Sequence, residues 1–366
     1  MLITFKGNRS QEIVINILDP AFSDYMETFL LEQKKKQPDF KVLVACSGGV
    51  DSMVLACVLT HTCQKIDAKY PILLHVNYGL RGEDSDADQA LVEEFAASHG
   101  LKAFCLDTKK QSFTQSVGNF QAWARQLRYD WFQTHASEHD VIALAHHQDD
   151  VAENMLMRMA RGSGPDVGGM RLWKKPFWRP FVSSSKEDIR EFADRQKVPF
   201  REDLSNASLK YDRNIVRHKI LPLLESMYPG AAQRMAALAA DLADHSDFLD
   251  AEFCEFLHAK YLHRSRIKSL PVGVALSVIA SFLKVKLGNE LRLNRSQLLR
   301  AYESLSQGKS WVEDLPGKGR IDVCSHKGLS VRFKSEAMHP RAAQYRAMLN
   351  HPGDEVLLET GARLIP

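Results

Sequence analysis

The chain has 366 residues, of which 45% are hydrophobic and 25% are charged, and its formal net charge is +3 at pH 7. That length and apolar content fit two or three domains with buried cores and exclude a disordered chain. Because the overall charge is nearly neutral, binding to nucleic acid would have to rest on a local basic cluster.

The cysteines and the hydropathy pattern indicate the cellular environment. No CxxC pair occurs, which argues against a zinc ribbon, a redox motif or a thiolase that carries a cluster. The six scattered cysteines are Cys46, Cys57, Cys63, Cys105, Cys254 and Cys324. The N-terminus has no continuous apolar run, and no uncharged apolar stretch approaches the ~20 residues that span a bilayer. We therefore expect a soluble cytoplasmic protein with reduced thiols and no membrane contact.

Short β-branched runs alternate with helical patterns from Phe40 to about Arg161. The runs typical of strands buried on both faces are 41–45, 72–76, 102–106 and 141–145. Helical spacing is found at 52–63, 84–100 and 119–135. Trp123, Leu127 and Trp131, for example, would form one stripe. This alternation predicts an α/β fold with right-handed crossovers and a doubly wound, mainly parallel sheet.

The pattern changes after residue 161. A segment rich in Gly and Trp, 162–180, is expected to end the regular alternation of strands and helices, and 185–197 is expected to be a helix capped by Ser185 and Asp188. A long amphipathic helix is predicted at 231–262, helices continue to about Leu305, and a small β element follows. The predicted regions are an N-terminal extension (1–39), an α/β domain (40–220), a helical domain (221–310) and a short C-terminal region (311–366).

In the segment ACSGGVDSM (45–53), serine, glycine and aspartate residues separate the apolar run KVLVA from the apolar run MVLACVL. It fits an ordinary turn in which Asp51 or Ser52 caps the following helix. It also fits a loop whose glycines and free backbone N–H groups bind a phosphate. The chain has neither GxxxxGK[ST] nor GxGxxG. An aspartate lies in the loop instead of a lysine. Because a carboxylate beside phosphates calls for a shared divalent cation, Asp51 predicts Mg²⁺.

Polar clusters follow two of the predicted strands, HVNYGLR (75–81) and HHQDDVAEN (146–154). The carboxyl ends of strands are where open α/β sheets bind ligands. His75 alone is more simply a packed histidine. Asp149 and Glu153 lie four residues apart and would share a helix face. HHQDD alone would also fit the site of a metal-dependent hydrolase, but such a site would not need SGGVDS beside it.

SGGVDS resembles the PP-loop signature of the ATP pyrophosphatase superfamily, enzymes that split ATP between its α- and β-phosphates. Further motifs in fixed order, over roughly residues 40 to 230, make the chain similar to the tRNA(Ile)-lysidine synthetase family. Besides the two polar clusters, these motifs are QAWARQLRY (121–129), RGSGP (161–165), WRPF (178–181), REDLSN (201–206) and YDRNIVRHKILPLL (211–224). Each motif alone is weak, but the ordered set is specific.

The resemblance implies a reaction on the isoleucine tRNA whose anticodon is CAU. ATP adenylates the 2-carbonyl oxygen of the wobble cytidine, and the amine of free lysine then displaces AMP to form lysidine. The enzyme must therefore hold three partners in line and neutralise phosphate charge. The implied substrates are ATP, L-lysine and this tRNA, with Mg²⁺ as the metal.

The resemblance also implies roles for individual residues. The triphosphate would be bound by Ser47, Gly48, Gly49, Val50, Asp51 and Ser52, with Asp51 also on Mg²⁺. Val76 and Asn77 would lie beside the adenosine. His146, Asp149 and Glu153, with Asp51, would be catalytic and would polarise the α-phosphate or grip the lysine ammonium. Contacts to tRNA would come from Arg125, Arg128, Arg161, Arg213 and Arg217, unless these lie on solvated helix faces.

The stretch from Arg171 to Lys219 is a basic cluster in its own right. It holds 13 Lys and Arg residues against 7 Asp and Glu residues. Trp173, Phe177 and Trp178 lie among these charges. They would either stack on nucleotide bases or be buried between domains.

The chain departs from the family pattern at three motif positions and at its C-terminal end. Tyr78 replaces a histidine, Gln121 a glutamate and Asn154 a threonine, and Asn154 puts its own role in doubt. The last fifty or so residues match poorly, so recognition of the tRNA acceptor stem is expected to be reduced. Two alternatives stay open: a PP-loop tRNA thiolase, and a tRNA-binding relative that has lost catalysis. The oligomeric state, a homodimer included, is also open.

Overall fold

The structure is a computed structural model in which the chain forms two compact units. The described residues are 2–3, 13–14, 20–108, 120–163, 168–202, 212–287, 293–309, 311–315, 319–324, 328–332, 356–357 and 363–364. The first unit consists of Met1–Gly162 with Asp166–His245, and the second of Ser163–Pro165 with Ser246–Pro366. The domain limits expected from the sequence stay predictions.

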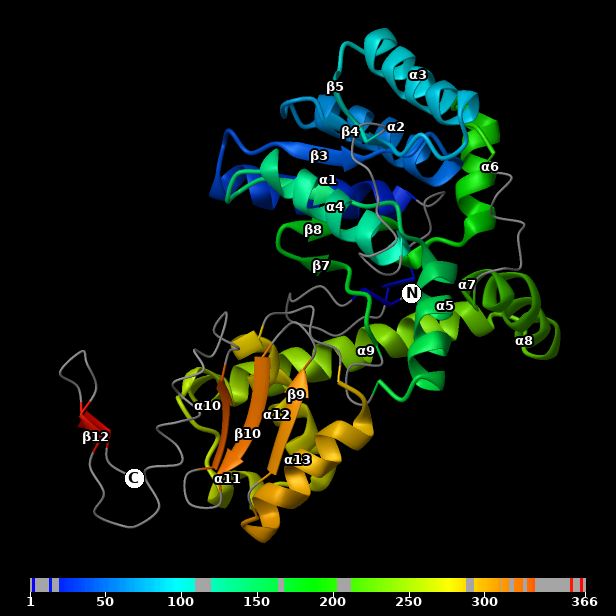
Figure 1. Ribbon diagram of the computed structural model, residues 1–366. Coiled ribbons are helices and arrows are strands. Elements are labelled where there is room, and N and C mark those ends of the chain that lie inside the picture. Colours follow the sequence, from blue (N-terminus) through cyan, green and yellow to red (C-terminus); the bar gives the residue numbers. More distant parts are fainter. Residues whose placement is uncertain are drawn as a thin grey trace. The chain divides into compact units, whose positions relative to one another are not determined.

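The first unit is built on a six-stranded sheet in the order β5-β4-β3-β6-β8-β7 (Figure 1). Its strands are β3 (Val42–Ala45), β4 (Ile72–Asn77), β5 (Lys102–Asp107), β6 (Val141–Ala143), β7 (Trp173–Lys174) and β8 (Phe177–Trp178). All neighbours are parallel except β7 and β8. The predicted doubly wound, mainly parallel sheet is therefore confirmed.

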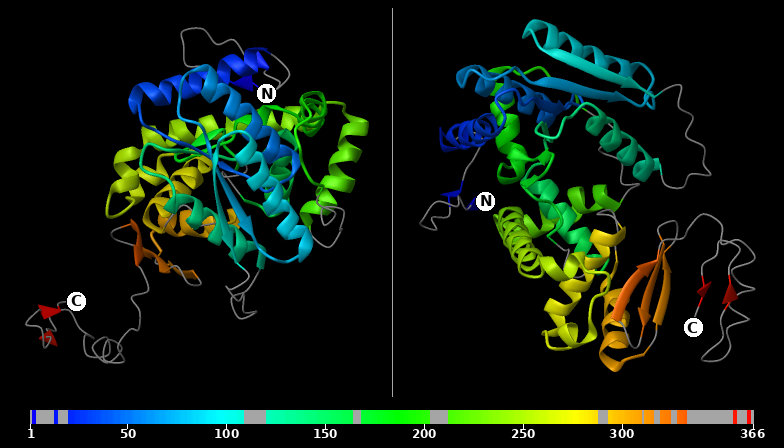
Figure 2. Two further views of the ribbon diagram at one scale, coloured as in Figure 1. Left: turned by 90° about the horizontal axis from the view of Figure 1, so that it is seen from above. Right: turned by 90° about the vertical axis from the view of Figure 1, so that its left-hand side faces the viewer.

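Helices cover both faces of this sheet (Figure 2). The helices of the first unit are α1 (Pro20–Lys36), α2 (Val50–Lys65), α3 (Glu83–Ser98), α4 (Phe120–Thr134), α5 (Gln148–Ala160), α6 (Lys186–Gln196), α7 (Asp212–Ile215), α8 (Leu221–Met227) and the first part of α9 (Ala231–Glu252). A 3₁₀ turn spans Pro180–Ser183, and a π-helical turn spans Val216–Ile220.

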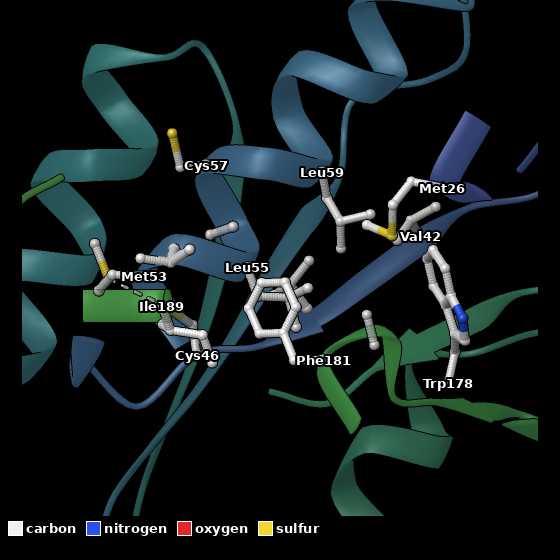
Figure 3. Packing of buried hydrophobic residues seen from close by; sticks show 14 of the residues in the cluster. Met26, Val42, Cys46, Met53, Leu55, Cys57, Leu59, Trp178, Phe181 and Ile189 are labelled. Atoms are coloured by element: carbon white, nitrogen blue, oxygen red, sulfur yellow. Dashed lines mark hydrogen bonds between the residues drawn. The ribbon is translucent and has the colours of Figure 1, made fainter. Parts of the chain in front are cut away.

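Alternate residues of the central strand β3 point to opposite cores. Val42 and Val44 belong to the core under α1, α2 and α6, which also contains Phe181 and Ile189 (Figure 3). Leu43 belongs to a second core with Phe132 of α4. β3 is thus buried on both faces, as its unbroken apolar run predicts.

The strand β5 is an exception to the expected burial. Its residues are half-buried or exposed, and Phe104 is among the exposed large apolar side chains. β5 lies at the edge of the sheet and pairs only with β4, so the covering layers end there. The prediction that this run is buried on both faces is wrong for that reason.

The segment expected to end the regular alternation of strands and helices adds β8 and β7 to the sheet. Trp178 is completely buried, its indole Nε1 donates a hydrogen bond of 2.8 Å to Tyr25 Oη, and its ring stacks on Phe29 at 4.1 Å. Trp178 therefore has no face on which a nucleotide base could stack, and it is buried inside the first unit. Tyr25 and Phe29 belong to α1, so part of the predicted N-terminal extension packs into the core.

Tyr25→Phe is expected to lower the free energy of unfolding of the first unit by about 1–3 kcal/mol, because it leaves a buried indole N–H without an acceptor. Chemical denaturation followed by tryptophan fluorescence measures the effect. Tyr70→Phe is the matched control, since Tyr70 is exposed. Equal stability of the two variants would contradict the importance of the Tyr25–Trp178 bond.

The predicted cap of α6 is confirmed. Ser185 Oγ accepts from Asp188 N at 3.0 Å, and Asp188 Oδ2 accepts from Ser185 N at 3.0 Å. This reciprocal pair fixes the start of α6. The position of that start matters for the site described below.

The second unit combines the end of α9 with α10 (Cys254–His258), α11 (Arg264–Lys268), α12 (Val272–Leu287), α13 (Arg295–Gln307), β9 (Trp311–Leu315), β10 (Gly319–Cys324) and β11 (Gly328–Arg332). The strands β9, β10 and β11 form an antiparallel sheet in the order β11-β10-β9. Two further antiparallel pairs join β1 (Leu2–Ile3) to β2 (Ile13–Val14) and β12 (Val356–Leu357) to β13 (Arg363–Leu364). Among the described residues, no helix has both the length and the apolar character needed to cross a membrane.

The single helix predicted for 231–262 is wrong. α9 ends at Glu252, Phe253 leaves the helical conformation, and α10 begins at Cys254. The break allows Phe253 and Leu257 to pack with the core of the second unit. Tertiary packing thus overrides the continuous helical pattern.

Candidate functional site

The segment Ser47–Ser52, called the glycine loop below, follows β3 and includes the first residues of α2. Ser52 Oγ accepts from Ser47 N at 3.0 Å and donates to Gly49 O at 2.9 Å, which holds the loop closed. Gly48 has φ +90°, and a Cβ there would lie 3.3 Å from Cβ and O of Asp88. Both the backbone conformation and the close approach of α3 therefore require glycine at this position.

The helix α2 starts without a side-chain cap among the described residues. Gly49 is the N-cap residue, and the Ser52 hydroxyl bonds within the loop. The interpretation of the loop as a turn capped by Asp51 or Ser52 is therefore wrong. An uncapped helix start with glycines before it offers backbone N–H groups to an anion.

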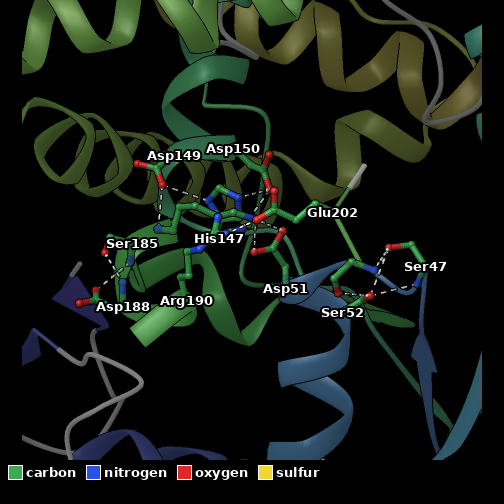
Figure 4. A network of polar contacts seen from close by, with 12 residues as sticks. Ser47, Asp51, Ser52, His147, Asp149, Asp150, Ser185, Asp188, Arg190 and Glu202 are labelled. Carbon is green, nitrogen blue, oxygen red and sulfur yellow. Dashed lines mark hydrogen bonds and ion pairs between the residues drawn. The ribbon is translucent and has the colours of Figure 1, made fainter. Parts of the chain in front are cut away.

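Three helices begin close to one another at this edge of the sheet. Lys186, the first residue of α6, places its Nζ 2.6 Å from both carboxylate oxygens of Asp51 in the first turn of α2. The backbone N–H of Lys186 donates to Oδ2 of Asp149, in the first turn of α5, at 2.9 Å. Figure 4 shows Asp51, His147 and Asp149 around this point. We call Asp51, Asp149 and Lys186 the three-helix cluster. Three helix starts, with their positive dipole ends, favour bound negative charge.

The histidine before α5 is buried between two carboxylates. His147 N donates to Asp150 Oδ2 at 3.1 Å, and His147 Nδ1 lies 3.2 Å from Asp149 Oδ2. Burial lowers the pKa of His147, but the charges of Asp150 and Asp149 outweigh it and leave that pKa raised. Burial raises the pKa of Asp149, and His147 more than offsets this, so Asp149 is ionised at neutral pH.

Glu153 lies deeper on α5 and is 0% exposed. Its carboxylate accepts from Nε of Arg213 at 2.7 Å and from Nε of Arg217 at 2.5 Å. Both arginines also donate to Oδ1 of Asp150, at 2.6 Å and 3.0 Å. These four residues form an ion-pair network with buried carboxylates and partly exposed arginines, and it ties α5 to the turn at 212–220. The predicted site residues Glu153, Arg213 and Arg217 thus come together, but they bind one another.

His146 is half-buried, and burial, helped by nearby arginines, lowers its pKa to about 3. Asp150 opposes the shift without cancelling it. At neutral pH His146 is therefore an uncharged imidazole. Its Nδ1 is buried and has no hydrogen-bond partner among the described residues.

The polar side chains at the end of β4 form hydrogen bonds within the protein. Asn77 is buried, and its Nδ2 donates to Asp86 Oδ1 at 2.9 Å and to Gln89 Oε1 at 3.0 Å, while its Oδ1 accepts from Gly79 N. His75 is buried as well, and its Nδ1 donates to Cys46 O at 2.9 Å. The interpretation of His75 as a packed histidine therefore fits its position. Val76 is half-buried.

The three remaining arginines lie at the surface of the first unit. Arg125 is exposed, with its guanidinium 4.4 Å from the centre of the Tyr129 ring, and Arg128 is half-buried at 5.9 Å from the same ring. Arg161 is 65% exposed and forms an ion pair of 3.3 Å with the exposed Asp212. Within the part of the chain that the structure describes, these three, unlike Arg213 and Arg217, are not held by buried carboxylates.

The carboxylate of the glycine loop fits only one kind of Mg²⁺ site. The described residues contain no group of three His, Cys, Asp or Glu that could hold a metal ion by themselves. Mg²⁺ at a nucleotide site needs only one or two carboxylates, with phosphate oxygens and water as the other ligands. The partly exposed Asp51 carboxylate at the start of α2 fits that kind of site.

Lys186 is the site residue that sequence analysis missed, since it was counted only as one of 13 basic residues. Its position directly after the capping Ser185 is a signal that could have placed it at a helix start.

A pocket of about 310 Å³ beside the glycine loop was also missed. It is lined by Arg81, Asp84, Asp88, Arg201 and Glu202. Arg201 N donates to Gly48 O at 3.0 Å, so this pocket adjoins the glycine loop.

Two of the three departures from the family motifs have visible contacts. Tyr78 Oη donates to Ala124 O at 2.9 Å, which ties the end of β4 to α4. Asn154 Nδ2 packs so closely on Gly169 that a Cβ there would lie 2.5 Å from it. The side chain of Gln121 lies outside the described residues.

A family model described as a PP-loop domain matches residues 18–224. A protein named tRNA(Ile)-lysidine synthase from Porphyromonas gingivalis is 33% identical over 222 residues, which cover 59% of this chain and 48% of that protein. Another of that name, from Bacillus licheniformis, is 32% identical over 357 residues, which cover 92% of this chain and 74% of that protein. The chain thus spans about half the length of the first relative and three quarters of the second.

Among solved structures, the chain is similar to the U34-tRNA thiolase NcsA from Methanococcus maripaludis with its [4Fe-4S] cluster. The identity is 19%, the TM-score is 0.47, and the match covers 60% of this chain and 80% of that one. A likeness this distant carries no functional argument.

Proposed function

Because the chain belongs to the PP-loop family and, within it, to the tRNA(Ile)-lysidine synthases, we propose that it is an ATP-dependent ligase. Its substrates would be ATP, lysine and the isoleucine tRNA with anticodon CAU, and its products lysidine-containing tRNA, AMP and pyrophosphate. The observation that carries the proposal is the meeting of three helix starts at Asp51, Asp149 and Lys186.

The glycine loop would bind the triphosphate of ATP through the free N–H groups at the start of α2. Mg²⁺ held by Asp51 would neutralise charge on the phosphates. The 2-carbonyl oxygen of the wobble cytidine attacks the α-phosphate, and pyrophosphate leaves. The lysine amine then forms a bond to C2 of the cytosine ring and loses a proton. The C2–O bond breaks, and the original carbonyl oxygen leaves as part of AMP.

Exposure separates the acids of α5 into different roles. Asp149 is 24% exposed and ionised, so a lysine ammonium can reach it. Glu153 is completely buried and fully used by two arginines, so its proposed role is to position α5. His146 is uncharged and would polarise the α-phosphate only through a hydrogen bond.

Contacts to tRNA phosphates would fall mainly to Arg125, Arg128 and Arg161. Arg213 and Arg217 are partly exposed as well, but their guanidinium groups bind the buried carboxylates of Asp150 and Glu153. Electrostatic contacts of this kind weaken as salt is raised. A cytoplasmic location and a homodimer stay predictions.

The thiol chemistry of a thiolase is disfavoured at Cys46 and Cys63. Cys46, beside the glycine loop, and Cys63 are both buried. Burial raises the pKa of Cys46 to about 11 and that of Cys63 to about 12. A thiol with such a pKa forms little thiolate, which is the reactive species.

The proposal predicts that the protein, with ATP and Mg²⁺, attaches labelled lysine to the isoleucine tRNA with anticodon CAU. Label recovered with the tRNA on a filter measures the reaction. A methionine tRNA with the same anticodon is the control and is expected to remain unlabelled. Absence of label in the isoleucine tRNA, with an active synthetase of the same family run in parallel, would refute the proposed function.

A further inference from the structure

The glycine loop contains a carboxylate but no lysine, and a lysine from far along the chain reaches it. Lys186 lies 135 residues after Asp51, and its Nζ is 2.6 Å from each of the two Asp51 oxygens. Its side chain is 42% exposed, and that of Asp51 is 26% exposed. The Lys186 side chain is therefore partly open to solvent while its ammonium pairs with the loop carboxylate.

The backbone of Lys186 is fixed while its side chain stays accessible. Its N–H is held by Asp149 at 2.9 Å, and the Ser185–Asp188 cap fixes the helix start just before it. One turn further, Ile189 is completely buried in the core beneath α2. Only the flexible four-carbon stem of Lys186 is left to move, so the ammonium can turn to a new partner without movement of α6.

We propose that Lys186 binds the phosphate oxygens of ATP and then those of the leaving pyrophosphate, and so supplies the cation that the glycine loop lacks. The inference rests on the proposed function in one respect, namely that ATP phosphates lie at the glycine loop. Without a ligand, Asp51 holds the ammonium. When phosphate occupies the loop, the ammonium contacts the phosphate oxygens, which attract it more strongly than one carboxylate.

The competing explanation is that Lys186 only orients Asp51. A double substitution separates the two. If Lys186 acts only through Asp51, its removal has no effect once Asp51 has been replaced by asparagine. If Lys186 touches phosphate, its removal weakens phosphate binding whether or not Asp51 is present.

The test is calorimetric titration of the full chain with inorganic pyrophosphate in EDTA, so that no divalent cation contributes. Lys186→Met is expected to weaken binding at least about tenfold, and Lys186→Arg to keep it within about threefold, because a charge-assisted hydrogen bond is lost in the first and kept in the second. Asp51→Asn is expected to tighten binding, because a repelling carboxylate is removed. The double variant, Asp51→Asn with Lys186→Met, is expected to bind pyrophosphate at least about tenfold more weakly than Asp51→Asn alone.

Lys69→Met is the matched control, because Lys69 also pairs with an exposed carboxylate, that of Asp39. It is expected to bind pyrophosphate like the unmodified chain, and circular dichroism verifies that all variants fold. The inference is overturned if the double variant binds like Asp51→Asn alone, or if the unmodified chain binds no pyrophosphate. Neither tRNA nor lysine is used, so failure of the lysidine reaction would leave this result standing.

Discussion

Replacing Asp51 by asparagine is expected to reduce tRNA-dependent exchange of labelled pyrophosphate into ATP by about a hundredfold to a thousandfold. Asp51 supplies the only carboxylate of the glycine loop, and Mg²⁺ bound there would neutralise the phosphates as the α-phosphate is attacked. Asparagine keeps the shape of the side chain and removes its charge. The loss should therefore appear in the rate of the chemical step.

The same substitution should leave the fold nearly unchanged. The Asp51–Lys186 ion pair is partly exposed on both sides, and such pairs contribute about 1 kcal/mol or less. Asp24→Asn on the exposed side of α1 is the control for both measurements. If Asp51→Asn exchanged pyrophosphate as fast as this control, Asp51 would have no role in the reaction.

Arg217→Ala is expected to lower the free energy of unfolding of the first unit by about 3–5 kcal/mol. The guanidinium of Arg217 contacts both oxygens of Glu153, which has no exposed surface, and also Asp150. Removing it leaves buried negative charge with one arginine instead of two. Chemical denaturation measures the loss.

Two further variants test the reason for that loss. Arg161→Ala removes an exposed arginine and should change stability by less than about 0.5 kcal/mol. Glu153→Gln added to Arg217→Ala should recover part of the stability, because it removes the uncompensated charge. If Arg217→Ala instead unfolds like the unmodified chain but loses tRNA affinity, Arg217 is a tRNA contact and not a support for α5.

The central sheet was predictable because β3 and β6 are unbroken apolar runs and β4 is a mainly apolar run, each between helical patterns. β7 and β8 were not, because two-residue strands carry no periodicity. The helix α1 was overlooked although its pattern is present. Phe22, Tyr25 and Met26 are buried at helical spacing.

The candidate site was predictable as a set of motifs and less so as a set of contacts. Helix starts at the glycine loop and at HHQDD follow from strand order, so their meeting at one edge could be foreseen. The pairing of Glu153 with Arg213 joins residues 60 apart, and nothing in either motif indicates it. The same holds for Lys186, whose contact with Asp51 depends on the packing of α6 against α2.

The fate of one oxygen atom tests the proposed reaction most directly. Isoleucine tRNA carrying ¹⁸O in the 2-carbonyl group of its wobble cytidine is incubated with the protein, ATP, Mg²⁺ and lysine, and the released AMP is analysed by mass spectrometry. Adenylation followed by displacement predicts one ¹⁸O atom in AMP for each lysine attached. AMP without ¹⁸O, or lysine attached without release of AMP, would contradict it.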